Sequence, residues 1–124
     1  MSERARHRDR GQATVEFALV LPLACLMLTG FIQVAVVVRD HLAVQAAARE
    51  AARAASVAAD GSGAATDAAQ RAINLRPIDV SVVEVDGVVI ATVTYVNHTD
   101  VPLIGPLLPD VTLEASVAMA IEPP

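Results

Sequence analysis

The segment from Gly11 to Val38 reads GQATVEFALVLPLACLMLTGFIQVAVVV, and its last 22 residues, from Phe17 onward, contain no Asp, Glu, Lys or Arg. As an α-helix these residues extend over about 33 Å, at about 1.5 Å per residue. The hydrocarbon core of a bilayer is about 30 Å thick, whereas the apolar core of a cleaved secretory signal has only about 7–15 residues. The segment therefore predicts a transmembrane helix with a span at about 17–38. The alternative is the buried core helix of a soluble domain, which so small a chain could hardly surround.

Charge on the two sides of this span predicts its orientation. Four arginines lie at positions 4, 6, 8 and 10, whereas the chain after Val38 carries five arginines against eleven acids. Basic residues beside a span stay in the cytoplasm. We therefore expect residues 1–11 to be a basic cytoplasmic leader and residues 39–124 to lie outside the cytoplasm. The acidic character of this outer part argues against direct nucleic-acid binding, which needs a basic surface.

The helix is expected to continue beyond the membrane. Residues 39–59 are rich in Ala, Arg, Glu and Gln, which favour helix, and neither Gly nor Pro occurs from Phe31 to Ala59. One helix from about Ala13 to Ala59 is the simplest interpretation, with a bend at Pro22, because proline removes a backbone donor. Residues 12–59 thus form the predicted span and its helical extension.

Two faces of the extension can be distinguished by helical spacing. Leu42, Ala46, Arg49 and Arg53 share one face, while Asp40, Val44 and Ala47 lie on another. The many alanines allow neighbouring helices to approach closely. We select three charged residues of this extension as candidate helix-packing residues: Arg49, Glu50 and Arg53.

A small exported α+β domain is predicted for residues 60–124. Asp60-Gly61-Ser62-Gly63 ends the long helix, and a short second helix from about Ala64 to Asn74 follows, capped by Ser62 or Thr66 and closed by Pro77.

Three strands are expected in the remainder of the chain. Residues 78–86 and 88–97 are rich in β-branched residues, and Asp86-Gly87 between them is a strong hairpin signal. Residues 111–122 alternate apolar and polar side chains, as a half-buried strand does. The sequence thus predicts a three-stranded antiparallel sheet, whose apolar face packs on the outer half of the long helix. Residues 98–109 form an irregular apolar loop that either packs on the sheet or contacts a partner.

No catalytic or metal site is predicted. The three histidines, His7, His41 and His98, fall in different regions without metal-ligand spacing. The serines have no His/Asp companion in the sequence pattern, and Gly61 and Gly63 do not form a phosphate loop. We therefore expect neither an enzyme nor a cofactor.

The single cysteine, Cys25, lies inside the apolar segment. Residues 21–25 faintly resemble a lipoprotein cleavage box, but Pro22 and Leu23 fit such a box poorly, and the apolar run continues for 13 residues beyond the cysteine. An apolar core cysteine is the simpler interpretation, and acylation at Cys25 is the alternative.

Two motifs together point to a family. Residues 10–22, RGQATVEFALVLP, and residues 47–55, AAREAARAA, resemble the TadE-like family of minor pilins, or pseudopilins, of the tight-adherence (type IVc) pilus system. The likeness is strong over about residues 10–57. The β-rich remainder matches that family only in outline.

The resemblance implies a pilin-like fold and a structural function in pilus assembly. A membrane-embedded prepilin peptidase would cut after Gly11, so that Gln12 becomes the new N-terminus, Glu16 the fifth mature residue and Phe17 the sixth. The Glu16 carboxylate would pair with an α-amino group of its own chain or of a neighbour. The implied partners are this peptidase, other major and minor pilins, the inner-membrane assembly platform and the lipid bilayer. The alternative is a single-pass envelope protein whose outer domain binds a ligand or a surface.

Overall fold

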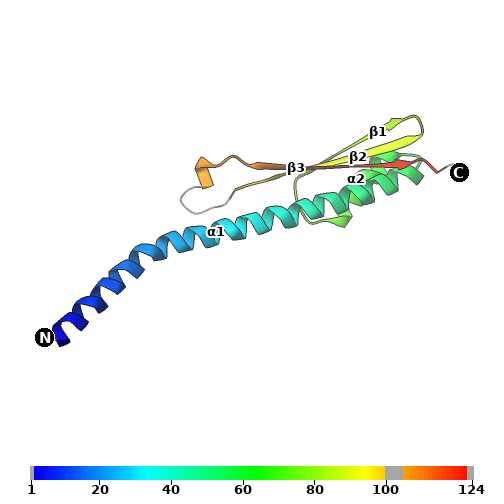
Figure 1. The fold of residues 1–124 in the computed structure, drawn as a ribbon. Helices are drawn as coiled ribbons and strands as arrows, with labels where there is room; N and C mark the ends of the chain where they lie inside the picture. Colours follow the sequence, from blue (N-terminus) through cyan, green and yellow to red (C-terminus); the bar gives the residue numbers. More distant parts are fainter. Residues whose placement is uncertain (1, 100–104, 123–124) are drawn as a thin grey trace.

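The computed structural model describes residues 2–99 and 105–122, with side chains from residue 11 onward (Figure 1). Two helices precede a three-stranded antiparallel sheet, which confirms the predicted α+β fold. The elements are α1 (Ser2–Val57), α2 (Gly61–Ala72), β1 (Ile78–Val85), β2 (Val88–Asn97), the short 3₁₀ helix η1 (Gly105–Leu107) and β3 (Val111–Ala120).

Helix α1 is longer at its N-terminus than the sequence predicted. It begins at Ser2 instead of near Ala13 and ends at Val57, so the arginine-rich leader is helical as well. A single glycine within a helix costs only about 1 kcal/mol relative to alanine, which explains why Gly11 does not interrupt it. The helix curves in its N-terminal half, the half that contains Pro22, as the missing backbone donor predicts (Figure 1).

Helix α2 begins three residues earlier than predicted, and its cap is a different residue. Asp60 is the N-cap, and its side chain accepts a hydrogen bond from the Gly63 amide at 3.1 Å. Ser62 and Thr66, the predicted caps, lie inside the helix, where the Thr66 hydroxyl donates to the Ser62 carbonyl. An aspartate three residues before a free amide is as good a cap as serine, so the helix begins at the first opportunity.

The C-terminal end of α2 is held by a side chain beyond the helix. The Arg76 guanidinium donates to the carbonyl oxygens of Gln70, Ile73 and Leu75 at 2.6, 3.0 and 2.7 Å. These carbonyls lie at and just beyond the end of α2, where intrahelical donors run out. Arg76 therefore satisfies carbonyl groups at the end of α2, which ends at Ala72, before Pro77 is reached.

The sheet has the order β1-β2-β3, and both pairs are antiparallel. The predicted hairpin is present, with Val85 opposite Val88 and both turn residues, Asp86 and Gly87, at positive φ (51° and 77°). A two-residue turn of this kind matches the twist of the flanking strands, which is why Asp-Gly is so frequent there.

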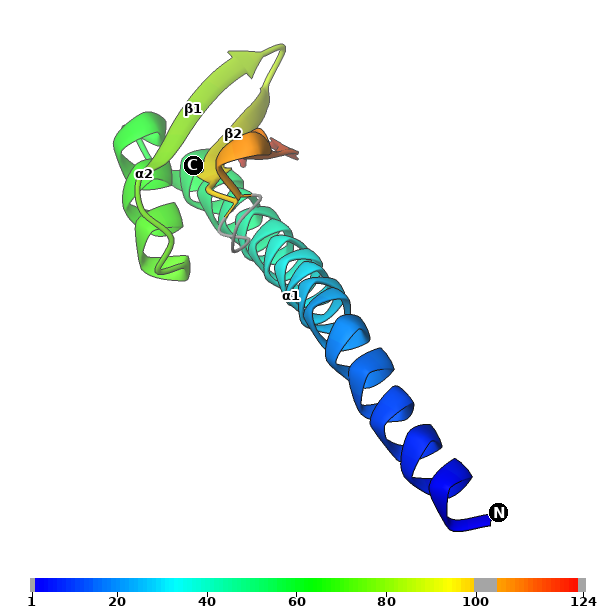
Figure 2. The same ribbon diagram turned by 90° about the vertical axis from the view of Figure 1, so that its left-hand side faces the viewer.

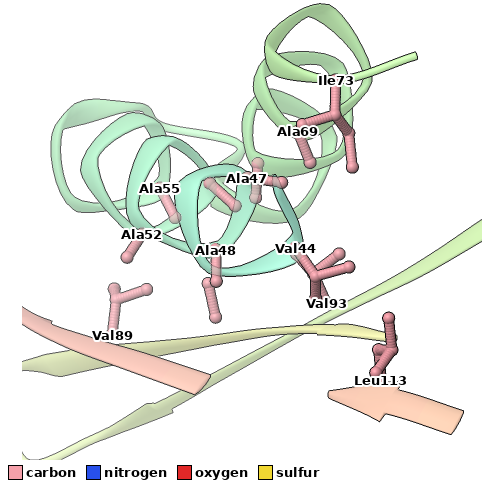
Figure 3. Packing of buried hydrophobic residues seen from close by; sticks show 13 residues of the cluster. Val44, Ala47, Ala48, Ala52, Ala55, Ala69, Ile73, Val89, Val93 and Leu113 are labelled. Carbon is pink, nitrogen blue, oxygen red and sulfur yellow. The ribbon is translucent and has the colours of Figure 1, made fainter. Parts of the chain in front are cut away.

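The core lies between the C-terminal part of α1, α2 and the inner face of the sheet (Figure 3). Helix α1 packs on β2 and β3, and α2 packs on α1 and β1. Alanine dominates the helical side of this core, and Val44 and Val93 are its largest fully buried side chains. Small side chains let the backbones approach closely, so the core is tight although it is small. Its buried members are Val44, Ala47, Ala48, Ala51, Ala52, Ala55, Ala65, Ala69, Ile73, Val89, Ala91, Val93 and Leu113.

Candidate membrane and assembly interface

The N-terminal part of α1 projects away from the rest of the chain (Figures 1 and 2). The part of the chain that the structure describes holds one helix long and apolar enough to cross a membrane, Gly11–Val57, with a mean hydropathy of 2.3 in its most apolar window. None of that window is buried, whereas the core helix of a soluble protein is mostly buried. This exposure favours a single-pass membrane anchor. Its large exposed side chains are Val15, Phe17, Leu19, Val20, Leu21, Leu23, Met27, Leu28, Phe31, Ile32, Val34 and Val38.

Gly11 and Gln12, the predicted processing site, lie on the exposed helical surface. A side chain added at Gly11 would meet no atom within 4 Å. The surface of α1 at Gly11 is therefore free of contacts with the described side chains, although the Gly11–Gln12 peptide bond itself lies within the helix.

Glu16 and Phe17 lie one helical turn further along α1, and both are exposed; 67% of the Phe17 surface is accessible. Among the side chains described from residue 11 onward, none pairs with the Glu16 carboxylate. On insertion scales an Asp at the centre of a membrane helix costs about 2.5–3.5 kcal/mol, and a carboxylate nearer the interface less. Gln12 and Glu16 are four residues apart, a spacing that puts two residues on the same helical face.

Arg49, Glu50 and Arg53 are all exposed, and each of them lines a different hollow of the chain surface. Arg49 lines a shallow groove between α1 and β3, together with Gln45 and Glu114. Arg53 lines a hollow at the other end of β3, whereas Glu50 lines a separate hollow against α2. Within the chain, α1 packs on α2 and the sheet through the buried alanines of its other side.

Sequence reasoning missed a buried polar cluster at the base of the sheet. Asp40 and Asn97 expose only 2% and 4% of their surface, and the Asn97 amide nitrogen donates to the Asp40 carboxylate at 2.6 Å. The guanidinium of Arg39 donates to the other carboxylate oxygen at 2.9 and 3.1 Å. Gln33 reaches the same place from within the apolar segment and donates to the Asn97 side-chain oxygen at 3.5 Å. The sequence signal was the position of Asp40 on one helical face with Val44.

The remaining polar candidates are scattered. The His41 ring is hydrogen-bonded to the Gln45 side chain on α1, and His98 pairs with Asp110 at 3.0 Å between the end of β2 and the start of β3. Within the described ranges, no group of three or more His, Cys, Asp or Glu side chains could hold a metal ion. Cys25 is a free thiol exposed on the apolar segment.

Comparison with known families gives one match. Residues 11–53 match the family of TadE-like proteins, which confirms the resemblance predicted from the two motifs. The matched range covers the candidate processing site, the apolar segment and the extension as far as Arg53. The match supports a protein associated with the tight-adherence pilus. Searches of curated proteins and of solved structures each gave no match.

Proposed function

We propose that this chain, with its TadE-like segment at residues 11–53, is a minor pilin or pseudopilin, a structural component for assembly of tight-adherence pili. The observation that carries the proposal is that α1 consists of an exposed apolar N-terminal part and a C-terminal part that packs in the core. Its buried residues begin at Asp40, whereas residues 11–39 have no buried position and expose apolar side chains. Such a helix can lie in a bilayer first and pack against the helices of neighbouring subunits afterwards.

Processing at Gly11 would prepare the chain for the transfer of α1 from the bilayer to contacts with neighbouring subunits. A prepilin peptidase would hydrolyse the Gly11–Gln12 peptide bond with one water molecule, leaving a carboxylate on Gly11 and a new α-amino group on Gln12. This amino group, in the same chain or in a neighbour, would pair with the Glu16 carboxylate. Such pairing offsets the cost of placing a carboxylate in an apolar environment, and it is available only after cleavage.

The proposed topology follows from the charges around the span. The leader, residues 1–11, would lie in the cytoplasm within reach of the inner-membrane assembly platform. The span would lie at about residues 17–38, and the sheet with α2 on the extracytoplasmic side. Arg49, Glu50 and Arg53 would then contact neighbouring major or minor pilins, since their own chain leaves them exposed.

The decisive experiment is intact mass measurement and N-terminal peptide sequencing of the protein from its native membrane. A mature chain that begins at Gln12, or at its cyclised pyroglutamyl form, supports processing as a prepilin. A chain that still carries Arg4 to Arg10 contradicts processing and supports a permanent anchor. Electron microscopy of the membrane-extracted protein supplies the second readout. A helical stack of α1 rods supports the pilin, whereas isolated monomers support the single-pass envelope protein with a binding domain.

A further inference from the structure

The end of the sheet lies beside the apolar segment of α1, within the predicted span. The Gln33 side-chain amide donates to the Asn97 side-chain oxygen and to the His98 backbone oxygen, each at 3.5 Å. Gln33 precedes Val38, the last residue of the predicted span, by five residues, which is about 7.5 Å along a helix. The end of β2 therefore lies level with the outer part of the span.

The face of α1 that meets the sheet continues further toward the N-terminus. Residues at a spacing of three or four remain half-buried as far as Leu26, in line with Asp40 and Val44 under the sheet. Figures 1 and 2 show η1 displaced from the sheet in the same direction, toward the N-terminal end of α1. This short helix therefore lies beside the outer part of the predicted span. The half-buried residues are Leu26, Thr29, Gly30, Gln33, Val36 and Val37.

Residues 105–108, which comprise η1 and the residue after it, present an apolar surface that the core does not use. Leu107 exposes 81% of its surface and Leu108 44%, whereas Gly105 is buried. The Leu108 amide donates to the Gly105 carbonyl at 3.1 Å, and Pro106 has no amide hydrogen to satisfy. Residues 105–108 carry no charge. The turn thus combines exposed leucines with few free backbone donors, which suits an environment with little water.

The base of this turn is held to the sheet. Asp110 pairs with the His98 ring at 3.0 Å and accepts a bond from the Thr99 amide at 3.4 Å. The Thr99 hydroxyl donates to the Pro109 carbonyl at 3.1 Å. These bonds tie the chain after η1 to the end of β2, so the position of the leucines follows that of the sheet.

We propose that Gly105–Leu108 inserts its leucines into the outer leaflet of the bilayer that α1 spans, and so makes a second membrane contact. The inference rests on the proposed membrane anchoring of α1. The turn would contact lipid at the boundary between headgroups and acyl chains, because exposed backbone groups are not tolerated deeper in the hydrocarbon core. Two contacts, one through α1 and one through this turn, would fix the rotation of the subunit about α1 before assembly.

The chain contains no tryptophan, so the fluorescence of a single introduced tryptophan reports only the environment of the substituted position. We would place Leu107→Trp, Phe31→Trp and Val83→Trp in the full chain, reconstituted in vesicles of phosphatidylethanolamine and phosphatidylglycerol with lipids brominated near the headgroup or deep in the chain. Phe31 is 67% exposed on the span, and Val83 is 54% exposed in the β1–β2 hairpin, away from η1. All three sites are exposed, so the substitutions leave the core intact.

We expect Leu107→Trp to be quenched several-fold more strongly than Val83→Trp, with shallow bromines the more effective, and its emission to shift to the blue. Phe31→Trp reports α1 separately and should also be quenched. If Phe31→Trp is quenched while Leu107→Trp behaves like Val83→Trp, the turn is outside the lipid and the inference is wrong, although the anchor stands. The leucines would then face a protein neighbour. If Phe31→Trp is not quenched, membrane anchoring fails and the inference fails with it.

Discussion

Asp40 of α1 and Asn97 at the end of β2 are joined by a buried hydrogen bond of 2.6 Å between residues 57 positions apart in the sequence. The second carboxylate oxygen is occupied by Arg39, so both oxygens of this nearly inaccessible group have donors. A buried charge is tolerable only when it is paired and hydrogen-bonded. The bond therefore fastens the sheet to α1 where the predicted span ends.

The first prediction is that Asn97→Ala lowers the free energy of unfolding of the α+β domain by about 1–3 kcal/mol. The substitution removes the donor and leaves the buried Asp40 oxygen unsatisfied, which costs about that amount. Asn74→Ala is the matched control, because Asn74 is exposed. Denaturant titration in detergent micelles, followed by circular dichroism, measures both variants. Equal midpoints for the two would show that the Asp40–Asn97 bond contributes nothing.

A second prediction concerns the alanine-rich side of the core. Ala48 is fully buried on the side of α1 that faces the sheet, between Ala52 and Val44 (Figure 3). Ala48→Leu should lower the free energy of unfolding by about 1–3 kcal/mol, because the added methylene groups force helix and sheet apart. Ala46→Leu makes the same change on the exposed face of α1 and should be nearly neutral. Two neutral variants would mean that the helix–sheet interface is loosely packed.

The pattern of elements was predictable because it depends on short-range signals. Period-two alternation gave β3, and Asp86-Gly87 gave the hairpin with its positive φ angles. The absence of Gly and Pro from Phe31 to Ala59 predicted that the helix continues beyond the span. These signals lie within a few residues of each other, so no knowledge of tertiary contacts was needed.

The details that were missed depend on contacts or on competing local choices. Asp60, Ser62 and Thr66 are all plausible caps, and only the fold decides which of them precedes the first helical turn. The Arg76 side chain caps the end of α2 from outside the helix by donating to the Gln70 carbonyl. The pairing of Asp40 with Asn97 joins two elements far apart in the chain, which a single sequence does not reveal.

The candidate interface rests on local signals, whereas the polar cluster does not. Glycine, glutamate and phenylalanine at fixed spacing before an apolar run form a motif, and the family match begins at Gly11. The structure adds that this motif is exposed and that Glu16 has no partner among the side chains described. The role of these residues in processing and assembly remains a prediction.

Gly11→Val should abolish cleavage without disturbing the chain itself. A side chain at this position meets nothing within 4 Å, and valine is a better helix former than glycine, so any loss arises in the peptidase's site. The readout is intact mass after coexpression with the cognate prepilin peptidase. Gly30→Val is the control, since that position is equally open to an added side chain. Normal cleavage of Gly11→Val would exclude Gly11 as the processing position.

Glu16→Ala should leave membrane insertion intact and reduce incorporation into filaments by about tenfold or more. Removing a carboxylate makes insertion easier, whereas losing about 1.4 kcal/mol of pairing with the Gln12 amine changes an equilibrium tenfold. Glu16→Gln keeps the size without the charge and should behave in the same way. The control is Glu84→Ala, which removes an exposed glutamate of β1 that has no proposed role in assembly. Membrane fractionation measures insertion, and quantitative immunolabelling of sheared filaments measures incorporation. If Glu16→Ala and Glu84→Ala are both incorporated like the unmodified chain, the Glu16 carboxylate has no pairing role. If Glu16→Gln alone is incorporated normally, the interaction is a hydrogen bond rather than an ion pair.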